Sequence, residues 1–238
     1  LINPKNVQPA IVEIVDIAGL VKGASKGEGL GNKFLANIRE THAIIHVLRC
    51  FDDPNVTHVD GMINPLNDKE TVELELQIKD LETLEKKKNN LKRLAASGDK
   101  AAIKNLDIIQ QYCEHISSGK SARSLSVVND DFILELNLLT KKPVLYVCNV
   151  DESSLLGNNY TEMIKDNIIE ENAEMLIISA QIEADINELE NSDDKQEFLN
   201  DLGLTEPGVN KIIKSAYSLL GLQTFFTAGE KEVRAWTI

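Results

Sequence analysis

The chain has 238 residues, of which 42% are hydrophobic, and a formal net charge of −13 at pH 7. This length and apolar content suit one large or two small globular domains and exclude a disordered tail. The negative charge argues against general coating of nucleic acid, because most of such a surface would repel a phosphate backbone, so only a local basic patch could override it.

No apolar run approaches the roughly 18 residues that a membrane helix needs, and the first residues lack the features of a signal peptide. Cys50, Cys113 and Cys148 are too few and too scattered for a disulfide framework or a zinc site. We expect buried, reduced thiols, a cytoplasmic location, and neither a membrane nor a DNA partner.

The stretch from Ile11 to Asn32 predicts a buried strand at residues 11–15, a glycine-dense loop and the start of a helix that continues over residues 34–40. Glycines let a backbone approach a phosphate closely. Those in this stretch are Gly19, Gly23, Gly27, Gly29 and Gly31. The apolar run at residues 43–50 predicts a central strand, so the order strand, loop, helix, strand favours a parallel α/β fold.

Two amphipathic helices are predicted next, because apolar residues recur at mostly three- and four-residue spacing on both sides of a turn at residues 95–99. The apolar positions of the first helix are Leu74, Ile78, Leu81, Leu84, Leu91 and Leu94. The two helices indicate a helical hairpin with a coiled-coil seam. Its flanks have an α/β pattern, so we interpret it as an insertion.

The rest of the chain continues the α/β pattern. Strands are expected at residues 144–148 and 174–178, helices at 132–140, 183–202 and 209–219, and a strand-like segment at 224–238.

Ligand-type residues stand at three of the predicted strand ends, and together they are a stronger signal than any one of them. Asp16 to Gly19 form a DxxG arrangement, in which the carboxylate holds Mg²⁺ and the glycine amide approaches a terminal phosphate. The alternative, that Asp16 caps the loop, stays open. Asn149 can read a purine edge and Glu152 can accept from an exocyclic or ring N–H, while Ser179 and Ala180 would close over the base.

Several stretches resemble the Obg-like ATPase (YchF) family of translation-factor-class P-loop NTPases. They are DIAGLVKGASKGEGLGNKFLANIRE, HVLRCFDD, NVTHVDG, NVDE, ISAQIEADI and LQTFFTAGEKEVRAWTI. The resemblance runs nearly end to end. It implies a P-loop NTPase G domain with an incomplete parallel-type sheet, an inserted helical coiled-coil hairpin and the start of a β-grasp (TGS) domain. The implied boundaries are 1–66 and 123–217 for the G domain, 67–122 for the hairpin and 218–238 for the TGS domain.

The family resemblance also implies an activity, the hydrolysis of ATP to ADP and phosphate with Mg²⁺ as cofactor. In the family the guanine-selecting NKxD becomes NxxE, here Asn149 to Glu152 with Val150 inside it, which implies ATP preferred over GTP. Leu20 stands where Ras-like proteins place a water-orienting glutamine. The family histidine proposed for catalysis corresponds to His58, for which a merely hydrogen-bonded loop histidine is an equal alternative.

One departure from the family pattern is that the printed sequence contains no GxxxxGK[ST] motif. In the family this loop lies upstream of a segment like residues 1–9. We therefore expect the chain to be an internal portion of a longer molecule, with a gap in its sheet, and to be inactive alone because the phosphate-holding lysine and amides are missing.

A basic cluster lies near the tip of the predicted hairpin, in a chain that is otherwise acidic. Its members are Lys86, Lys87, Lys88, Lys92 and Arg93. It is either a solvated helix face or a contact for ribosomal RNA, and the family's ribosome association favours the second slightly. The sequence thus leaves two functions open: a nucleotide hydrolase, or a non-catalytic, nucleotide-switched module that binds the ribosome or RNA.

Overall fold

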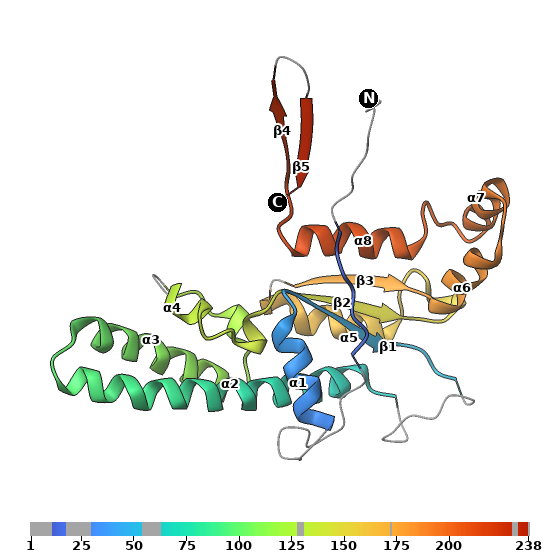
Figure 1. The fold of residues 1–238 in the computed structure, drawn as a ribbon. Helices are drawn as coiled ribbons and strands as arrows, with labels where there is room; N and C mark the ends of the chain where they lie inside the picture. Colours follow the sequence, from blue (N-terminus) through green and yellow to red (C-terminus); the bar gives the residue numbers. More distant parts are fainter. Residues whose placement is uncertain are drawn as a thin grey trace.

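The protein is described from a computed structural model, which covers residues 11–17, 30–53, 63–127, 131–171, 173–229 and 233–237. Three parallel strands form the central sheet in the order β1-β2-β3 (Figure 1). Their bounds are β1 Ile44–Arg49, β2 Val144–Asn149 and β3 Glu174–Ile178. The central strand β2 is buried from Val144 to Cys148, as its unbroken apolar run requires, which confirms the parallel α/β class.

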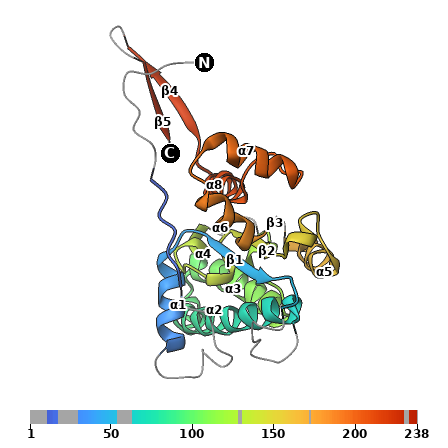
Figure 2. The ribbon, with the colours of Figure 1, turned by 90° about the vertical axis from the view of Figure 1, so that its right-hand side faces the viewer.

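Helices cover both faces of this sheet, as Figures 1 and 2 show. Helix α8 (Gly208–Leu219) lies on one face, against β2 and β3. Helix α5 (Asn159–Ile168) lies on the other, where Ile164 and Ile168 pack against Tyr146 and Cys148 of β2. Helix α1 (Leu30–Glu40) packs Leu35 and Ile38 against the long helix α2. The core is therefore divided between the two sides of the sheet.

The predicted helical hairpin is present as α2 (Pro65–Ala96) and α3 (Lys100–Ser117), which pack side by side and project from the body (Figure 1). Asp99 caps α3 by accepting hydrogen bonds from two of its first amides. Leu84 and Leu91 lie in the buried seam, as predicted. Leu74 and Leu94 do not, since they are 55% and 51% exposed, and this part of the predicted apolar stripe is wrong.

The strand expected at residues 11–15 is also wrong. Residues 11–17 form neither strand nor helix, and Ile11 is 92% exposed. A strand needs a hydrogen-bonded neighbour, and within the described residues β1 pairs with β2 alone. The apolar composition of residues 11–15 predicts that they are buried, but most of them are exposed in the described structure.

The helix expected at residues 132–140 is broken into α4 (Asp131–Leu134) and the 3₁₀ helix η2 (Leu139–Lys141). Between them Asn137 adopts the left-handed region with φ 48°, which ends a helix. The buried carboxylate of Asp80 on α2 accepts from the amides of Leu139 and Thr140 at 2.7 and 2.8 Å. A long-range partner thus satisfies backbone groups that a continuous helix would have satisfied locally.

The acidic helix expected at 183–202 is two helices, α6 (Ala180–Glu188) and α7 (Ser192–Asp201), with Asn191 capping the second. The remaining short elements are η1 (Ala122–Ser124), η3 (Glu152–Ser154) and η4 (Ile169–Glu171). None of the helices in the described part of the chain has both the length and the apolar content needed to cross a membrane.

The C-terminal segment forms an antiparallel hairpin of β4 (Thr224–Ala228) and β5 (Val233–Thr237) that stands away from the central sheet (Figure 2). The strand character predicted around Val233 and Trp236 is confirmed. The cysteines Cys50, Cys113 and Cys148 are free, and the first and third are buried, as expected.

Candidate functional site

The three parallel strands end in one row, which is called the carboxyl edge below. Arg49 is aligned with Asn149, and Asn149 with Ile178. The pairing continues past the strands, because the amide of Cys50 donates to the Asn149 carbonyl and the amide of Val150 donates to the Ile178 carbonyl, both at 2.8 Å. Parallel α/β sheets bind ligands just beyond this edge, which is where the predicted residues that follow β2 and β3 lie, whereas Asp16 does not follow a strand.

Two of the predicted positions are joined by a direct hydrogen bond. Oδ1 of Asn149 accepts from the amide of Ala180 at 2.9 Å. Ser179 lies between the strand and α6 as the N-cap, and its Oγ accepts from the Ile182 amide at 3.5 Å. With Oδ1 occupied, the Nδ2 group of Asn149 remains as a donor, and it makes no hydrogen bond to any residue that the structure describes. Such a group can donate to N7 of a purine.

The loop after β2 exposes the carboxylate of Glu152, which begins η3. Its neighbour Asp151 is engaged elsewhere, since its Oδ1 accepts from the Ser153 hydroxyl at 2.7 Å. Hydrogen bonds from Ser153 and Ser154 lower the pKa of Asp151 from its ordinary value. Val150 is buried and its amide is paired, so any contact that it makes with a ligand is limited to its carbonyl oxygen.

The predicted phosphate side of the site is described only in part. Asp16 has an exposed carboxylate, a suitable hard oxygen ligand for Mg²⁺. Gly19, Leu20 and His58 lie outside the described residues. Among the residues that the structure does describe, no group of three or more His, Cys, Asp or Glu side chains is placed to hold a metal ion.

A set of hydrogen bonds across the carboxyl edge was not predicted from the sequence. Asn158 and Tyr160, at the start of α5, hydrogen-bond to Cys50 and Asp52 in the loop that leaves β1. The sequence does signal the cap, because Asn158 precedes Thr161 at capping-box spacing. No local sequence pattern predicts that the partners are Cys50 and Asp52.

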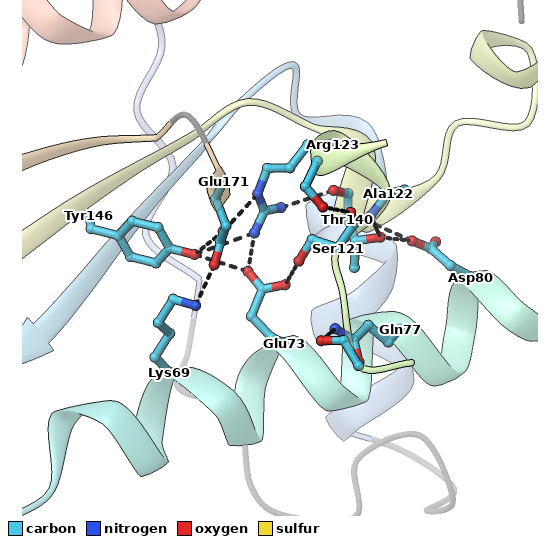
Figure 3. Close-up of polar contacts among 12 residues, drawn as sticks. Lys69, Glu73, Gln77, Asp80, Ser121, Ala122, Arg123, Thr140, Tyr146 and Glu171 are labelled. Carbon is cyan, nitrogen blue, oxygen red and sulfur yellow. Dashed lines mark hydrogen bonds and ion pairs between the residues drawn. The ribbon is translucent and has the colours of Figure 1, made fainter. Parts of the chain in front are cut away.

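A buried charge cluster joins the base of the helical hairpin to the sheet (Figure 3). It consists of Lys69 and Glu73 of α2, Arg123 of η1, Tyr146 of β2 and Glu171 of η4. Lys69 Nζ lies 2.6 Å from Glu171 Oε1, and Arg123 Nε lies 3.1 Å from Glu171 Oε2. Arg123 also pairs with Glu73, and the Tyr146 hydroxyl donates to Glu171 at 2.9 Å. Two cations and two carboxylates balance each other, which is what permits their burial.

The protonation of this cluster follows from its contacts. Burial alone would raise the pKa of Glu73, but Arg123 and the Ser121 hydroxyl, which donates at 2.6 Å, outweigh it and hold the pKa low. Burial and the Glu73 carboxylate raise the pKa of Tyr146. The Glu73 carboxylate therefore stays ionised beside the Arg123 guanidinium, and the cluster fixes α2 against β2.

The basic cluster lies in the last third of α2, on the part that projects from the body. Lys86, Lys92 and Arg93 are exposed and make no ion pair with any described residue, whereas Lys88 lies 3.8 Å from Glu85. Between residues 86 and 106 the one acidic residue is Asp99, which caps α3. The projecting end is thus positively charged in a chain of net charge −13.

The sheet order, the ligand-type residues at its carboxyl edge and the helical hairpin define a protein of the P-loop GTPase fold. A family model described as a 50S ribosome-binding GTPase matches residues 2–94. The solved structure of the Schizosaccharomyces pombe YchF GTPase matches with a TM-score of 0.78 and 35% identity, over 93% of this chain and 61% of that chain.

Curated relatives make the assignment narrower. The ribosome-binding ATPase YchF of Bacillus subtilis is 48% identical over 100% of this chain, and that of Escherichia coli O157:H7 is 44% identical over the same share. The chain belongs to the YchF family. It spans 66% of the length of these relatives.

Proposed function

We propose that the protein binds ATP in preference to GTP at the carboxyl edge, hydrolyses it to ADP and phosphate, and acts as a ribosome-associated regulator in the cytoplasm. The names of the relatives, a ribosome-binding ATPase and a GTPase, support a nucleotide and a ribosome as binding partners. The observation that carries the proposal is the 2.9 Å hydrogen bond between Asn149 Oδ1 and the Ala180 amide, with Glu152 exposed on the adjoining loop.

The base is recognised by complementary donors and acceptors. Asn149 donates from Nδ2 to N7 of the purine, while its bond to Ala180 fixes the plane of the amide. Glu152 accepts from the 6-amino group of adenine, where guanine presents a carbonyl oxygen that a carboxylate repels. Ser179 and Ala180 lie along the edge of the base, with Ser179 held as the α6 cap.

On the phosphate side, Asp16 would hold Mg²⁺ and the amide of Gly19 would bind the γ-phosphate. The ion neutralises charge on the phosphate oxygens when it is bound. His58 lies near the attacking water and orients it or accepts its proton. Water oxygen attacks the γ-phosphorus as the bond to the β,γ-bridging oxygen breaks, giving ADP, phosphate and one proton.

Single-turnover hydrolysis of ATP by the full-length protein, with His58→Ala measured beside it, tests this chemistry. We expect turnover in the wild type and a loss of about a hundredfold in the variant, the lower end of the usual range for a general base. Turnover in neither protein would reject the enzyme and leave the nucleotide-switched binding module. Equal turnover in both would remove His58 from the mechanism.

The base assignment has a separate test in Glu152→Asp. A shorter carboxylate should shift the ratio of ATP to GTP affinity toward GTP, which competition binding with the two nucleotides measures. An unchanged ratio would reject the role given to Glu152, whether or not hydrolysis occurs.

The ribosome contact is assigned to the basic cluster on the projecting end of the hairpin. We propose that residues 67–122 are an insertion into a G domain of residues 1–66 and 123–217, and that 218–238 begin a TGS domain. Helix α2 has 32 residues, which at about 1.5 Å per residue places its tip roughly 48 Å from its start. Exposed cations at that distance suit the phosphate backbone of ribosomal RNA.

Two variants with the same change in charge test this contact by ribosome co-sedimentation. In the first, Lys92 and Arg93 become glutamate. In the matched control Lys165 of α5 and Lys211 of α8, outside the projecting end of the hairpin, become glutamate. We expect the first variant to lose most binding at physiological salt and the second to bind as the wild type does. Replacing all five members of the basic cluster without any loss of co-sedimentation would reject the assignment.

A further inference from the structure

We infer that Asn158 and Tyr160 are positioning residues for the hydrolysis: they hold the chain that leaves β1 and couple it to the loop that recognises the base. The inference rests on the proposed function, because the chain leaving β1 leads to His58. It assigns no chemical step to either residue. Both act by fixing backbone at the carboxyl edge.

Asn158 uses the two ends of its side-chain amide for two different segments. Its Oδ1 accepts from the Thr161 amide at 3.1 Å and thereby caps α5, while the Thr161 hydroxyl closes the capping box. Its Nδ2 donates to the carbonyl of Cys50 at 2.8 Å. A cap needs only the oxygen, so the second bond serves the segment that follows β1.

Tyr160 provides a second tie to the same segment. Its hydroxyl lies 3.0 and 3.1 Å from the two carboxylate oxygens of Asp52 and donates to them. From the other side, the Arg49 guanidinium donates to the carbonyls of Phe51 and Asp53 at 3.2 and 3.1 Å and stacks on the Phe51 ring. Residues 50–53 are thus held from α5 and from β1, five residues before His58 in the sequence.

The same first turn of α5 ends the base-recognition loop. Gly157, directly before Asn158, has φ 108°, and a Cβ there would lie 3.0 Å from Thr161 Oγ1. The loop from Glu152 to Gly157 therefore meets α5 at a backbone position that favours glycine. Because the loop end and the chain leaving β1 share Asn158 as an anchor, a displacement of one is transmitted to the other.

We expect loss of the Asn158 and Tyr160 hydrogen bonds to affect the rate of hydrolysis more than the affinity for nucleotide. A reacting group misplaced by about 1 Å costs up to a hundredfold in rate. Tyr160→Phe removes only the hydroxyl, and Asn158→Ser keeps a capping oxygen but removes Nδ2. Asn191→Ser is the matched control, since Asn191 caps α7 and its side chain hydrogen-bonds to Asp193 and Asp194 of that same helix.

The experiment measures single-turnover hydrolysis, ATP affinity and melting temperature on the full-length protein. We expect Tyr160→Phe and Asn158→Ser to slow hydrolysis about tenfold with ATP affinity changed less than twofold, and Asn191→Ser to leave both unchanged. Wild-type rates in the two edge variants, or a loss of affinity that parallels a lower melting temperature, would overturn the inference.

His58→Ala in the same assay separates this inference from the proposed function. If the edge variants slow hydrolysis and His58→Ala does not, the role given to His58 fails, and with it the route by which Asn158 and Tyr160 are inferred to act. If His58→Ala slows hydrolysis and the edge variants do not, the positioning role fails and the proposed function stands.

Discussion

Folding stability should fall steeply in mild acid because of one histidine. His46 on β1 is aligned with Tyr146, with ring centroids 5.7 Å apart, and faces the buried charge cluster, where two carboxylates and two cations largely offset each other. Burial therefore dominates and lowers the pKa of His46 from 6.5 to about 4. Between these values the unfolded chain binds a proton that the folded chain excludes, so stability decreases as pH falls.

The size of the effect follows from the two pKa values. At pH 8 histidine is neutral in both states, whereas at pH 5 the linkage relation gives a loss of about 2 kcal/mol in the free energy of unfolding. His46→Phe keeps a ring against Tyr146 and removes the titration. Urea unfolding of wild type and variant, followed by circular dichroism at pH 8 and pH 5, should show the wild type losing about 2 kcal/mol more than the variant. Equal losses in the two proteins would refute the reasoning.

Three further substitutions test the packing, each read as a change in urea-unfolding free energy. Asp80→Ala leaves two buried amides without acceptors and should cost about 3 kcal/mol, with Asp80→Asn, which keeps one oxygen, costing less; equal costs would contradict this account. Arg123→Met strands the carboxylates of Glu73 and Glu171 and should cost about 3 to 5 kcal/mol, and a neutral result would show that the cluster contributes nothing to the fold. Gly157→Ala forces a side chain into a left-handed conformation, so it should cost about 1 to 2 kcal/mol, and a stabilised variant would contradict the strain.

The fold was predictable where burial is encoded locally. The apolar run of β2 and the spacing of Leu84 and Leu91 on α2 each indicate an element and the side that it buries. The same rule failed at residues 11–15, because composition reports a tendency to be buried and not the presence of a neighbouring strand. It failed again at Asn137, where an acceptor 59 residues before Leu139 in the sequence replaces the local helix bonds.

The candidate site was predictable for a related reason, since parallel strands place their carboxyl ends in one row. That rule brings Asn149 next to Ala180 without any knowledge of side-chain contacts. The tie from Tyr160 to Asp52 spans 108 residues and depends on where α5 crosses the sheet, which no local pattern encodes. Residue types at strand ends therefore predict where a site lies, but they do not predict the long-range hydrogen bonds that position its backbone.

Helix α2 shows why charge must be read with position. Two groups of its charged residues cannot be told apart by composition. Lys69 and Glu73 are buried, where Glu171 and Arg123 pair with them. Lys92 and Arg93 are exposed on the projecting end. A buried pair must be compensated within the protein because desolvation is costly, and an exposed cluster of one sign has no such partner. The first group therefore fixes the helix to the body, and the second is left to attract an anionic surface. One continuous helix joins the two, so the part proposed to meet RNA is built on the part clamped to the sheet whose carboxyl edge is the candidate nucleotide site.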